Sequence, residues 1–161
     1  METTNQSYGG FWIRFVAYVI DAIILGIVLG IVIIPVLGAL GFGAYGTMSG
    51  GGEMSEDQMS ALIGMITGAG LFMQVANIVV AWLYFALMES SGKQATVGKM
   101  ALGLKVINKD GSKLNFGQAT VRYIGKIISS MILLIGFIMA GFTEKKQALH
   151  DMIAGTYVVK G

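Results

Sequence analysis

Arg14 and Asp21 are the side chains whose chemistry and placement in this sequence are most unusual. Both lie in the apolar stretch FWIRFVAYVIDAIILGIVLGIVII, and no charged residue follows Asp21 until Glu53. An Asp or Arg at the centre of a membrane helix costs roughly 2.5 to 3.5 kcal/mol on insertion scales, so such a residue faces protein or water. Asp21 is therefore a candidate carboxylate for a cation or a proton, and a buried structural ion pair is the alternative.

Arg14 and Asp21 lie on one face of the predicted helix, at i and i+7. About 10 Å of axial rise separates them, so a direct bond is not expected and each needs another partner. The sequence offers Arg122, Lys126 and Asp151 for this role. The charged candidates for an intramembrane or ion-binding site are thus Arg14, Asp21, Arg122 and Asp151, with Lys126 as a secondary candidate.

Gln74 and Asn77 are further secondary candidates, because they lie mid-membrane on one face of the second apolar helix. They either line an ion path or bond to a neighbouring helix, which is the commoner use. The chain has no cysteine, and His150 is its only histidine, so neither a thiolate nor a histidine metal cluster is expected. No catalytic nucleophile, base and orienting group can be assembled, and we predict neither enzymatic activity nor a cofactor.

Composition identifies the bilayer as the solvent of this chain. Apolar residues make up 55% and charged residues 12%, and the mean hydropathy is +0.72; a soluble domain carries about a quarter charged residues. Windows 22–52 and 58–88 contain no charged side chain and exceed the roughly 20 residues that a membrane helix needs. A third window, 127–143, is at the short limit of about 17 residues.

The distribution of charge predicts the topology. The loop between the first two windows contains acidic residues and no basic ones, whereas the segment after the second window is basic. Cytoplasmic loops of membrane proteins are rich in Lys and Arg. The expected location is the bacterial cytoplasmic (inner) membrane, multi-pass, with the N-terminus inside. The bases are spaced rather than clustered, which favours lipid contact over nucleic acid. They are Lys93, Lys99, Lys105, Lys109, Lys113, Arg122 and Lys126.

The expected fold is an all-α membrane protein with two long transmembrane helices, a third spanning or re-entrant segment and a small cytoplasmic β-hairpin or strand element. A single domain covers residues 1–161. Pro35 should end the first helix, Ser55 should begin a capping box, and Asp110-Gly111 should form the type I′ turn of the hairpin. The expected elements are a helix over 11–34, an outer loop over 35–54, a helix over 56–88, a hairpin over 103–115, amphipathic and membrane helices over 116–142, and a strand over 155–160.

The third segment has two possible paths. A full crossing would separate the C-terminal strand from the hairpin, whereas a re-entrant path that turns near Gly136 would return the strand to pair with it. The segment PVLGALGFGAYGTMSGGG after the first helix is likewise either a loop or a second piece of helix. We favour the returning path for the third segment, because pairing covers the open edge of the hairpin.

Several segments together resemble the RDD family of small bacterial membrane proteins: GFWIRFVAYVIDAIIL, YFALMESSGKQATVGKMALGLKVINKDG, ATVRYIG and KKQALHDMIAGTYVV. The arginine and two aspartates of the family name correspond to Arg14, Asp21 and Asp151. Its T-x-G-K element corresponds to Thr96-Val97-Gly98-Lys99, with Val97 where the family usually has proline. The resemblance implies a polytopic membrane protein for which transport, including cation/proton exchange, has been suggested.

Two functions are compatible with these features. The first is transport of a cation, a proton or a small solute by an oligomer, since two or three spans enclose no pathway within one copy. The second is an accessory or regulatory subunit that binds another membrane protein. The expected partners are the lipid bilayer, a second copy or another membrane protein, and a monovalent cation or proton.

Overall fold

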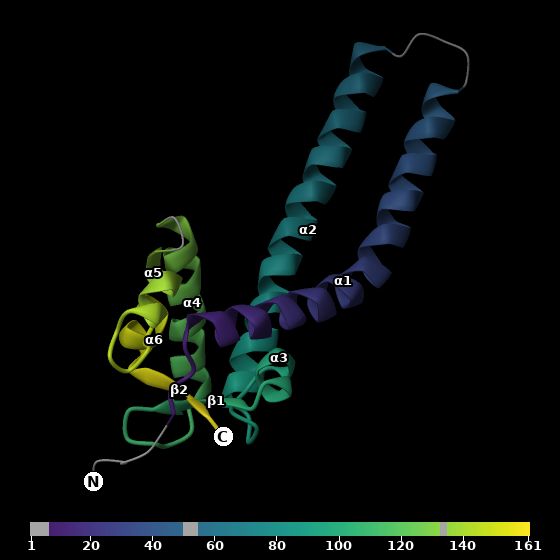
Figure 1. Ribbon diagram of the computed structural model, residues 1–161. Helices are drawn as coiled ribbons and strands as arrows, with labels where there is room; N and C mark the ends of the chain where they lie inside the picture. The colour runs from purple at the N-terminus through teal and green to yellow at the C-terminus, as the bar shows by residue number, and fades with distance from the viewer. Residues whose placement is uncertain (1–6, 50–54, 133–134) are drawn as a thin grey trace. The chain divides into compact units, whose positions relative to one another are not determined.

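Two long apolar helices, of 38 and 35 residues, make up a little less than half of the 161-residue chain. In the computed structural model, which describes residues 7–49, 55–132 and 135–161, α1 spans Phe11–Met48 and α2 spans Glu56–Ser90 (Figure 1). Within the segments Phe11–Gly46 and Glu56–Ser90, the most apolar 18-residue windows have mean hydropathies of 3.0 and 1.9, and both segments are long enough to cross a membrane. The predicted pair of membrane helices is therefore confirmed.

Pro35 does not end α1. The helix continues to Met48, so the predicted limit at residue 34 is wrong, and so is the predicted outer loop over residues 35–48. Residues 50–54 of that loop lie outside the described residues. A proline removes one backbone N–H and crowds the carbonyl four residues earlier, but the peptide groups of its apolar neighbours can be satisfied in lipid only within a helix.

The start of α2 is capped as predicted. The backbone N–H of Ser55 donates to Gln58 Oε1 at 3.0 Å, and the backbone N–H of Gln58 donates to Ser55 Oγ at 3.2 Å. Glu56 and Asp57 occupy the first turn, where the helix dipole favours acids. The helix ends at Ser90, two residues beyond the predicted limit.

The chain divides into two compact units. Unit 2 is Ile24–Val80, and unit 1 consists of the chain up to Ile23 together with Ala81–Gly161. Large apolar side chains of unit 2, such as Ile31 and Phe72, are 70% and 75% exposed. Such a surface is typical of helices that face lipid. Every element after α2 belongs to unit 1.

A two-stranded antiparallel sheet joins distant parts of unit 1. β1 (Leu104–Asn108) pairs with β2 (Thr156–Lys160), with Val106 opposite Val158. The predicted pairing of the C-terminal strand is thus confirmed. Both edges of the sheet are covered, since the backbone N–H of Gly9 donates to Val158 O and that of Val106 donates to Gln94 O.

The predicted hairpin over residues 103–115 has only one strand. After β1 the chain turns, and the backbone N–H of Gly111 donates to Asn108 O, which makes Lys109 and Asp110 the central residues of the turn. Asp110 has no positive φ, so the predicted type I′ turn is wrong. The Asp110 carboxylate instead accepts hydrogen bonds from the backbone and hydroxyl of Ser112. β2 occupies the place beside β1 that a second hairpin arm would take.

The remaining helices are shorter: α3 (Val97–Ala101), α4 (Phe116–Met131), α5 (Ile135–Ile138), η1 (Met139–Gly141) and α6 (Leu149–Ala154). Asn115 and Gln118 form a reciprocal cap at the start of α4. α6 packs on α4 (Figure 1) at Gly125, where a Cβ would lie 3.0 Å from the Cα of His150. A side chain at residue 125 would separate the two helices.

The third apolar segment is broken. α4 and the helical segment Ile135–Gly141 meet at 117°, so they do not form one straight span. β2 follows this segment and pairs with β1, which precedes it. The bend and the pairing together support the returning path, in which both ends of the segment lie on one side.

The core of unit 1 is built from small and branched side chains. Ala17, Ala86 and Ala119 allow helices α1, α2 and α4 to approach closely, and the strands supply valines and a leucine. Its buried apolar members are Ala17, Ala86, Leu104, Val106, Leu114, Ala119 and Val158. This core brings the ends of α1, α2, α3, α4 and α6 that carry charges into contact.

Candidate functional site

Asp151, in the first turn of α6, holds two arginines from other helices. Its Oδ2 accepts a hydrogen bond from Arg14 Nη1, and its Oδ1 lies 2.6 Å from Arg122 Nη2. Oδ2 also accepts the backbone N–H of Ala148 at 3.1 Å, which fixes the carboxylate at the start of α6. Arg14 Nε and Nη2 donate to the backbone carbonyls of Gly9 and Lys146. The predicted partnership of Arg14 with Asp151 is therefore present.

Glu89, near the end of α2, is the second buried carboxylate. Its Oε1 lies 2.5 Å from Lys99 Nζ and 3.1 Å from Lys126 Nζ. Its Oε2 lies 3.2 Å from Arg122 Nη1. Glu89 is 1% exposed, so water does not screen these charges and the three cations must stabilise the carboxylate. Lys126 also lies over the ring of Phe85, 4.0 Å from its centroid.

Arg122 connects the two carboxylates into one network, because its guanidinium contacts both Glu89 and Asp151. We name this network the charge cluster: Arg14, Glu89, Lys99, Arg122, Lys126 and Asp151. It links α1, α2, α3, α4 and α6. With four bases and two acids, it carries two more positive than negative charges when every member is ionised.

The excess positive charge affects Lys99. Burial lowers the pKa of its ammonium, Lys126 and Arg122 lower it further, and Glu89 opposes them only in part, so the pKa is about 7. Lys99 therefore loses its proton near neutral pH, unlike an ordinary exposed lysine. Burial raises the pKa of Asp151, but Arg122 and Arg14 outweigh that effect and hold it well below its usual range. Asp151 is thus ionised.

Asp21 lies in a separate cradle of hydrogen-bond donors. Its Oδ1 accepts hydrogen bonds from the Tyr84 hydroxyl and the Gly98 backbone N–H, each at 2.7 Å. Its Oδ2 accepts one from Thr96 Oγ1 at 2.6 Å. Within the described ranges no basic side chain lies within ion-pair distance of this carboxylate, so the expected pairing of Asp21 with a base is wrong. The hydroxyls and the amide take the place of a counter-ion.

Gly98 is required by the close approach of α3 to α1. A Cβ at this position would lie 2.0 Å from Ala17 O, so any side chain would push the helices apart. The neighbouring Val97 donates its backbone N–H to the Tyr84 hydroxyl at 3.1 Å. A proline at residue 97 has no N–H to donate. Val97 therefore adds a bond that orients the tyrosine toward Asp21.

Two of the secondary candidates lie outside both arrangements. Gln74 and Asn77 are exposed in unit 2 and belong to neither the charge cluster nor the Asp21 cradle. His150 contacts Asp151 at 3.4 Å, but burial lowers the pKa of its imidazole to about 3 despite that carboxylate. It is therefore neutral near pH 7. Among the described residues, no group of three or more His, Cys, Asp or Glu side chains could hold a metal ion.

Comparison with known proteins identifies the family. The model of the RDD family matches residues 8–155, which include every residue of the charge cluster and of the Asp21 cradle. The chain belongs to the RDD family. It is similar to the uncharacterized protein YxaI of Bacillus subtilis, with 41% identity over 93% of this chain and 95% of that relative. It is also similar to the uncharacterized membrane protein YteJ of Bacillus subtilis, with 31% identity over 98% of this chain and 84% of that relative. No solved structure gives a significant match.

The RDD residues thus divide between two arrangements. Arg14 and Asp151 bind each other in the charge cluster, whereas Asp21 bonds to the Thr96-Val97-Gly98-Lys99 motif. That motif joins the two, since Thr96 and Gly98 contact Asp21 while Lys99 contacts Glu89. The family signature accordingly describes the contacts that hold α1, α3 and α6 together.

Sequence reasoning did not identify Glu89, Lys99 and Tyr84 as site residues. A signal for Glu89 was present, because it is the first charged residue after the window 58–88, and Lys99 closes the T-x-G-K motif. Tyr84 reads as an interfacial aromatic residue, and only the structure shows its hydroxyl directed at Asp21.

We expect Glu89→Gln to lower the free energy of unfolding by roughly 3–5 kcal/mol, because three cations would lose their shared carboxylate. Removing Lys99 as well, in the Glu89→Gln/Lys99→Met protein, should restore part of the loss. Denaturation in detergent measures both changes. Glu144→Gln is the matched control, since Glu144 is exposed. An equal effect of Glu89→Gln and Glu144→Gln would contradict a stabilising charge cluster.

We expect stability to rise as the pH is raised from about 7 toward 10. The pKa of Lys99 is about 7 in the folded protein and about 10.5 in the unfolded chain, so the unfolded state binds more protons between these values. Lys99→Met should flatten this part of the profile of melting temperature against pH. Lys113→Met, at an exposed lysine, should leave the slope unchanged. If the melting temperature of the Lys99→Met protein still rises with pH, the titrating group is not Lys99.

Proposed function

We propose that this RDD protein is an accessory or regulatory membrane subunit that binds another membrane protein through α2. The observation that carries the proposal is a pair of side-chain amides, Gln74 and Asn77, exposed near the middle of that helix. They are three residues apart and lie on one face. An amide in hydrocarbon has no water to bond with, so a polar group on a neighbouring helix is its natural partner.

The distribution of charge supports a subunit rather than a self-sufficient transporter. All ion pairs of the charge cluster join residues of unit 1, and Glu56 and Asp57, at the start of α2, are the only charged side chains among the described residues of unit 2. A hydrophilic pathway would need polar groups along the spans, and Gln74 and Asn77 alone do not provide one. Membership of the RDD family and the two long apolar helices support a membrane location.

The proposed setting is the bacterial cytoplasmic (inner) membrane, with a multi-pass arrangement and the N-terminus inside. The basis is the asymmetry of charge, since the bases of residues 89–126 follow a helix that begins with Glu56 and Asp57. The relatives named in Bacillus subtilis support a bacterial setting.

Transport by an oligomer is the second candidate, and one observation favours it. Asp21 is 1% exposed, and its described partners are two hydroxyls and a backbone N–H rather than a base. Hydroxyl and carboxylate oxygens suit a monovalent cation, and a buried carboxylate can carry a proton. The Gly98 N–H counts against a cation, because an N–H group cannot serve as a ligand.

A photo-crosslinking residue placed at Asn77 tests the subunit proposal in native membranes. We expect a discrete adduct with a different polypeptide, because the amide face is the proposed contact. Val75 is the matched control, since it is also exposed and lies about 200° away around the helix. Adducts with a second copy alone would indicate a homo-oligomer and overturn the proposal. The absence of any adduct at Asn77, or equal adducts at both positions, would also overturn it.

The melting temperature of the Asp21→Asn protein, measured with and without sodium across pH, separates the two functions. We expect only a modest loss, about 1–2 kcal/mol, because an amide retains the acceptor for Gly98 and Tyr84 and can donate to Thr96. For a subunit, sodium should not change the melting of either protein. If sodium raises the melting temperature of the unmodified protein and not of Asp21→Asn, Asp21 binds the cation and transport is favoured.

A further inference from the structure

Helices α4, α5 and α6 pack on one another in unit 1 (Figure 1), and their exposed surface carries no charged side chain among the residues that the structure describes. From Val121 onward, every exposed side chain of α4 except that of Ser130 is large and apolar. Isoleucines of α5 and α6 are exposed as well. We name this surface the apolar face and define it by Val121, Ile124, Ile128, Met131, Ile135 and Ile153.

The polarity of α4 is the reverse of that of a helix on a water-soluble protein. Arg122 and Lys126 lie on its inner side, where both bases contact the buried carboxylate at the end of α2. Val121, Ile124 and Ile128 lie on its outer side, at the spacing of three and four residues that places them on one face. A helix on a soluble protein buries the apolar stripe and exposes the charges. Charges turned toward the protein interior are typical of a helix in lipid.

The contacts between the three helices explain why the large side chains lie outside. A Cβ at Gly125 of α4 would lie 3.0 Å from the Cα of His150 in α6, and a Cβ at Gly136 of α5 would lie 2.6 Å from Ser129 Oγ in α4. These contacts leave no space between the helices for branched side chains. Ile153 Cδ1 lies 3.7 Å from the same Cβ position at Gly125, so the apolar face continues from α4 onto α6.

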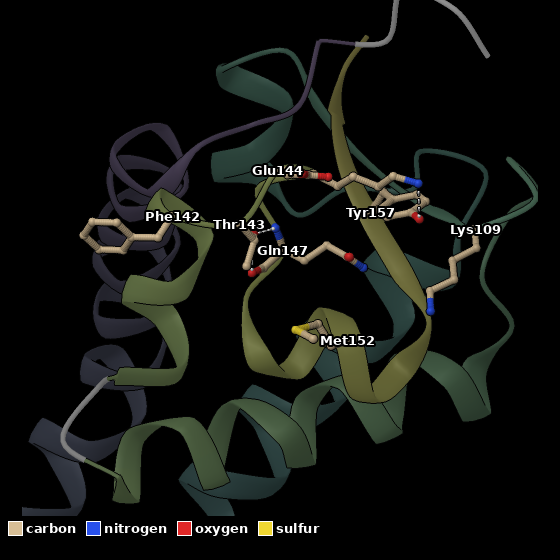
Figure 2. Close-up of a pocket in the computed structure, with 8 residues that line it drawn as sticks. Lys109, Phe142, Thr143, Glu144, Gln147, Met152 and Tyr157 are labelled. Atoms are coloured by element: carbon tan, nitrogen blue, oxygen red, sulfur yellow. Dashed lines mark hydrogen bonds between the residues drawn. The ribbon is translucent and has the colours of Figure 1, made fainter. Parts of the chain in front are cut away.

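The exposed charges of unit 1 lie on other segments. Within the described ranges they are at residues 93, 105–113, 144–146 and 160, on loops and strands. Phe142, which is 86% exposed, directly follows η1 and marks the end of the apolar surface, because Glu144 is exposed and charged. In the close-up of the hollow beside β2, the ring of Phe142 points away from Gln147 and Tyr157 (Figure 2). A body with apolar and charged residues on separate elements suits the boundary between lipid and water.

We propose that the apolar face lies against the acyl chains of the bilayer, so that unit 1 is embedded in lipid along α4, α5 and α6. Water is a poor solvent for so many large apolar side chains. Another protein is a poor match too, because helices associate in lipid through small residues and polar groups, and the apolar face is made of long and branched side chains.

The proposal assigns lipid contact to residues that hydropathy alone does not mark. Val121 and Ile124 precede the apolar window 127–143, and the basic residues of α4 lower the hydropathy of their segment. The charge cluster then has hydrocarbon rather than water behind α4. This inference is independent of the α2 face on which the proposed function rests.

Spin labels on single cysteines test the proposal, since the full-length chain has no cysteine of its own. Electron paramagnetic resonance in liposomes of phosphatidylethanolamine and phosphatidylglycerol measures collisions of each label with oxygen, which concentrates in hydrocarbon, and with a water-soluble nickel chelate. We expect the ratio of oxygen to nickel collisions to be severalfold higher for Ile124→Cys and Ile128→Cys than for Lys113→Cys. Lys113 is the control for water, and Ile31, exposed in unit 2, is the control for lipid.

Two results would overturn the proposal. A ratio at Ile124 and Ile128 equal to that at Lys113 would show that the apolar face is in water. Few collisions with either reagent would show that a second copy or another protein covers it. Unchanged melting temperatures establish that the labelled proteins are folded, and Met131→Cys and Ile135→Cys, at two of the most exposed positions of the face, supply the same test if the first pair is not.

Discussion

The burial of ionised side chains is the constraint on which the rest of unit 1 depends. Glu89, Arg122 and Asp151 are each no more than 1% exposed, and the free energy lost on removing such groups from water must be recovered from their partners. Arg122 contacts both carboxylates and therefore joins the two acids in one network. Every helix that contributes to the charge cluster is positioned by this requirement.

Close approach of the backbone is the second requirement, and it follows from the first. Short ion pairs between helices are possible only where the helices approach without intervening side chains. Gly98 allows α3 to contact α1, and Gly125 allows α6 to contact α4. Unit 2 follows a different rule, since its helices expose large apolar side chains and carry few polar groups. One chain therefore combines a unit held by buried charge with a unit shaped by contact with lipid.

Local patterns in the sequence predicted the elements that depend on local chemistry. The charge-free windows predicted both long helices, Ser55 predicted the start of the second, and the open edge beside residues 103–115 predicted the pairing of the C-terminal strand. The failures depend on tertiary contacts. Pro35 is tolerated because the surrounding residues have no alternative to a helix in lipid, and Asp21 is stabilised by hydroxyls and an amide that lie more than 60 residues away. The central role of Glu89 likewise requires knowledge of which bases surround it.

The order in which the partners are synthesised has a consequence for the assembly of unit 1 in the membrane. Arg14 enters with α1, whereas its carboxylate partner Asp151 follows 137 residues later, and Ser7–Gly9 must wait for β2 before its backbone can pair. During that interval the guanidinium has no carboxylate, and its long side chain can reach water at the membrane surface. Both long helices are thus synthesised before unit 1 can close. A contact between such distant segments makes closure of unit 1 a late event in the biogenesis of this protein.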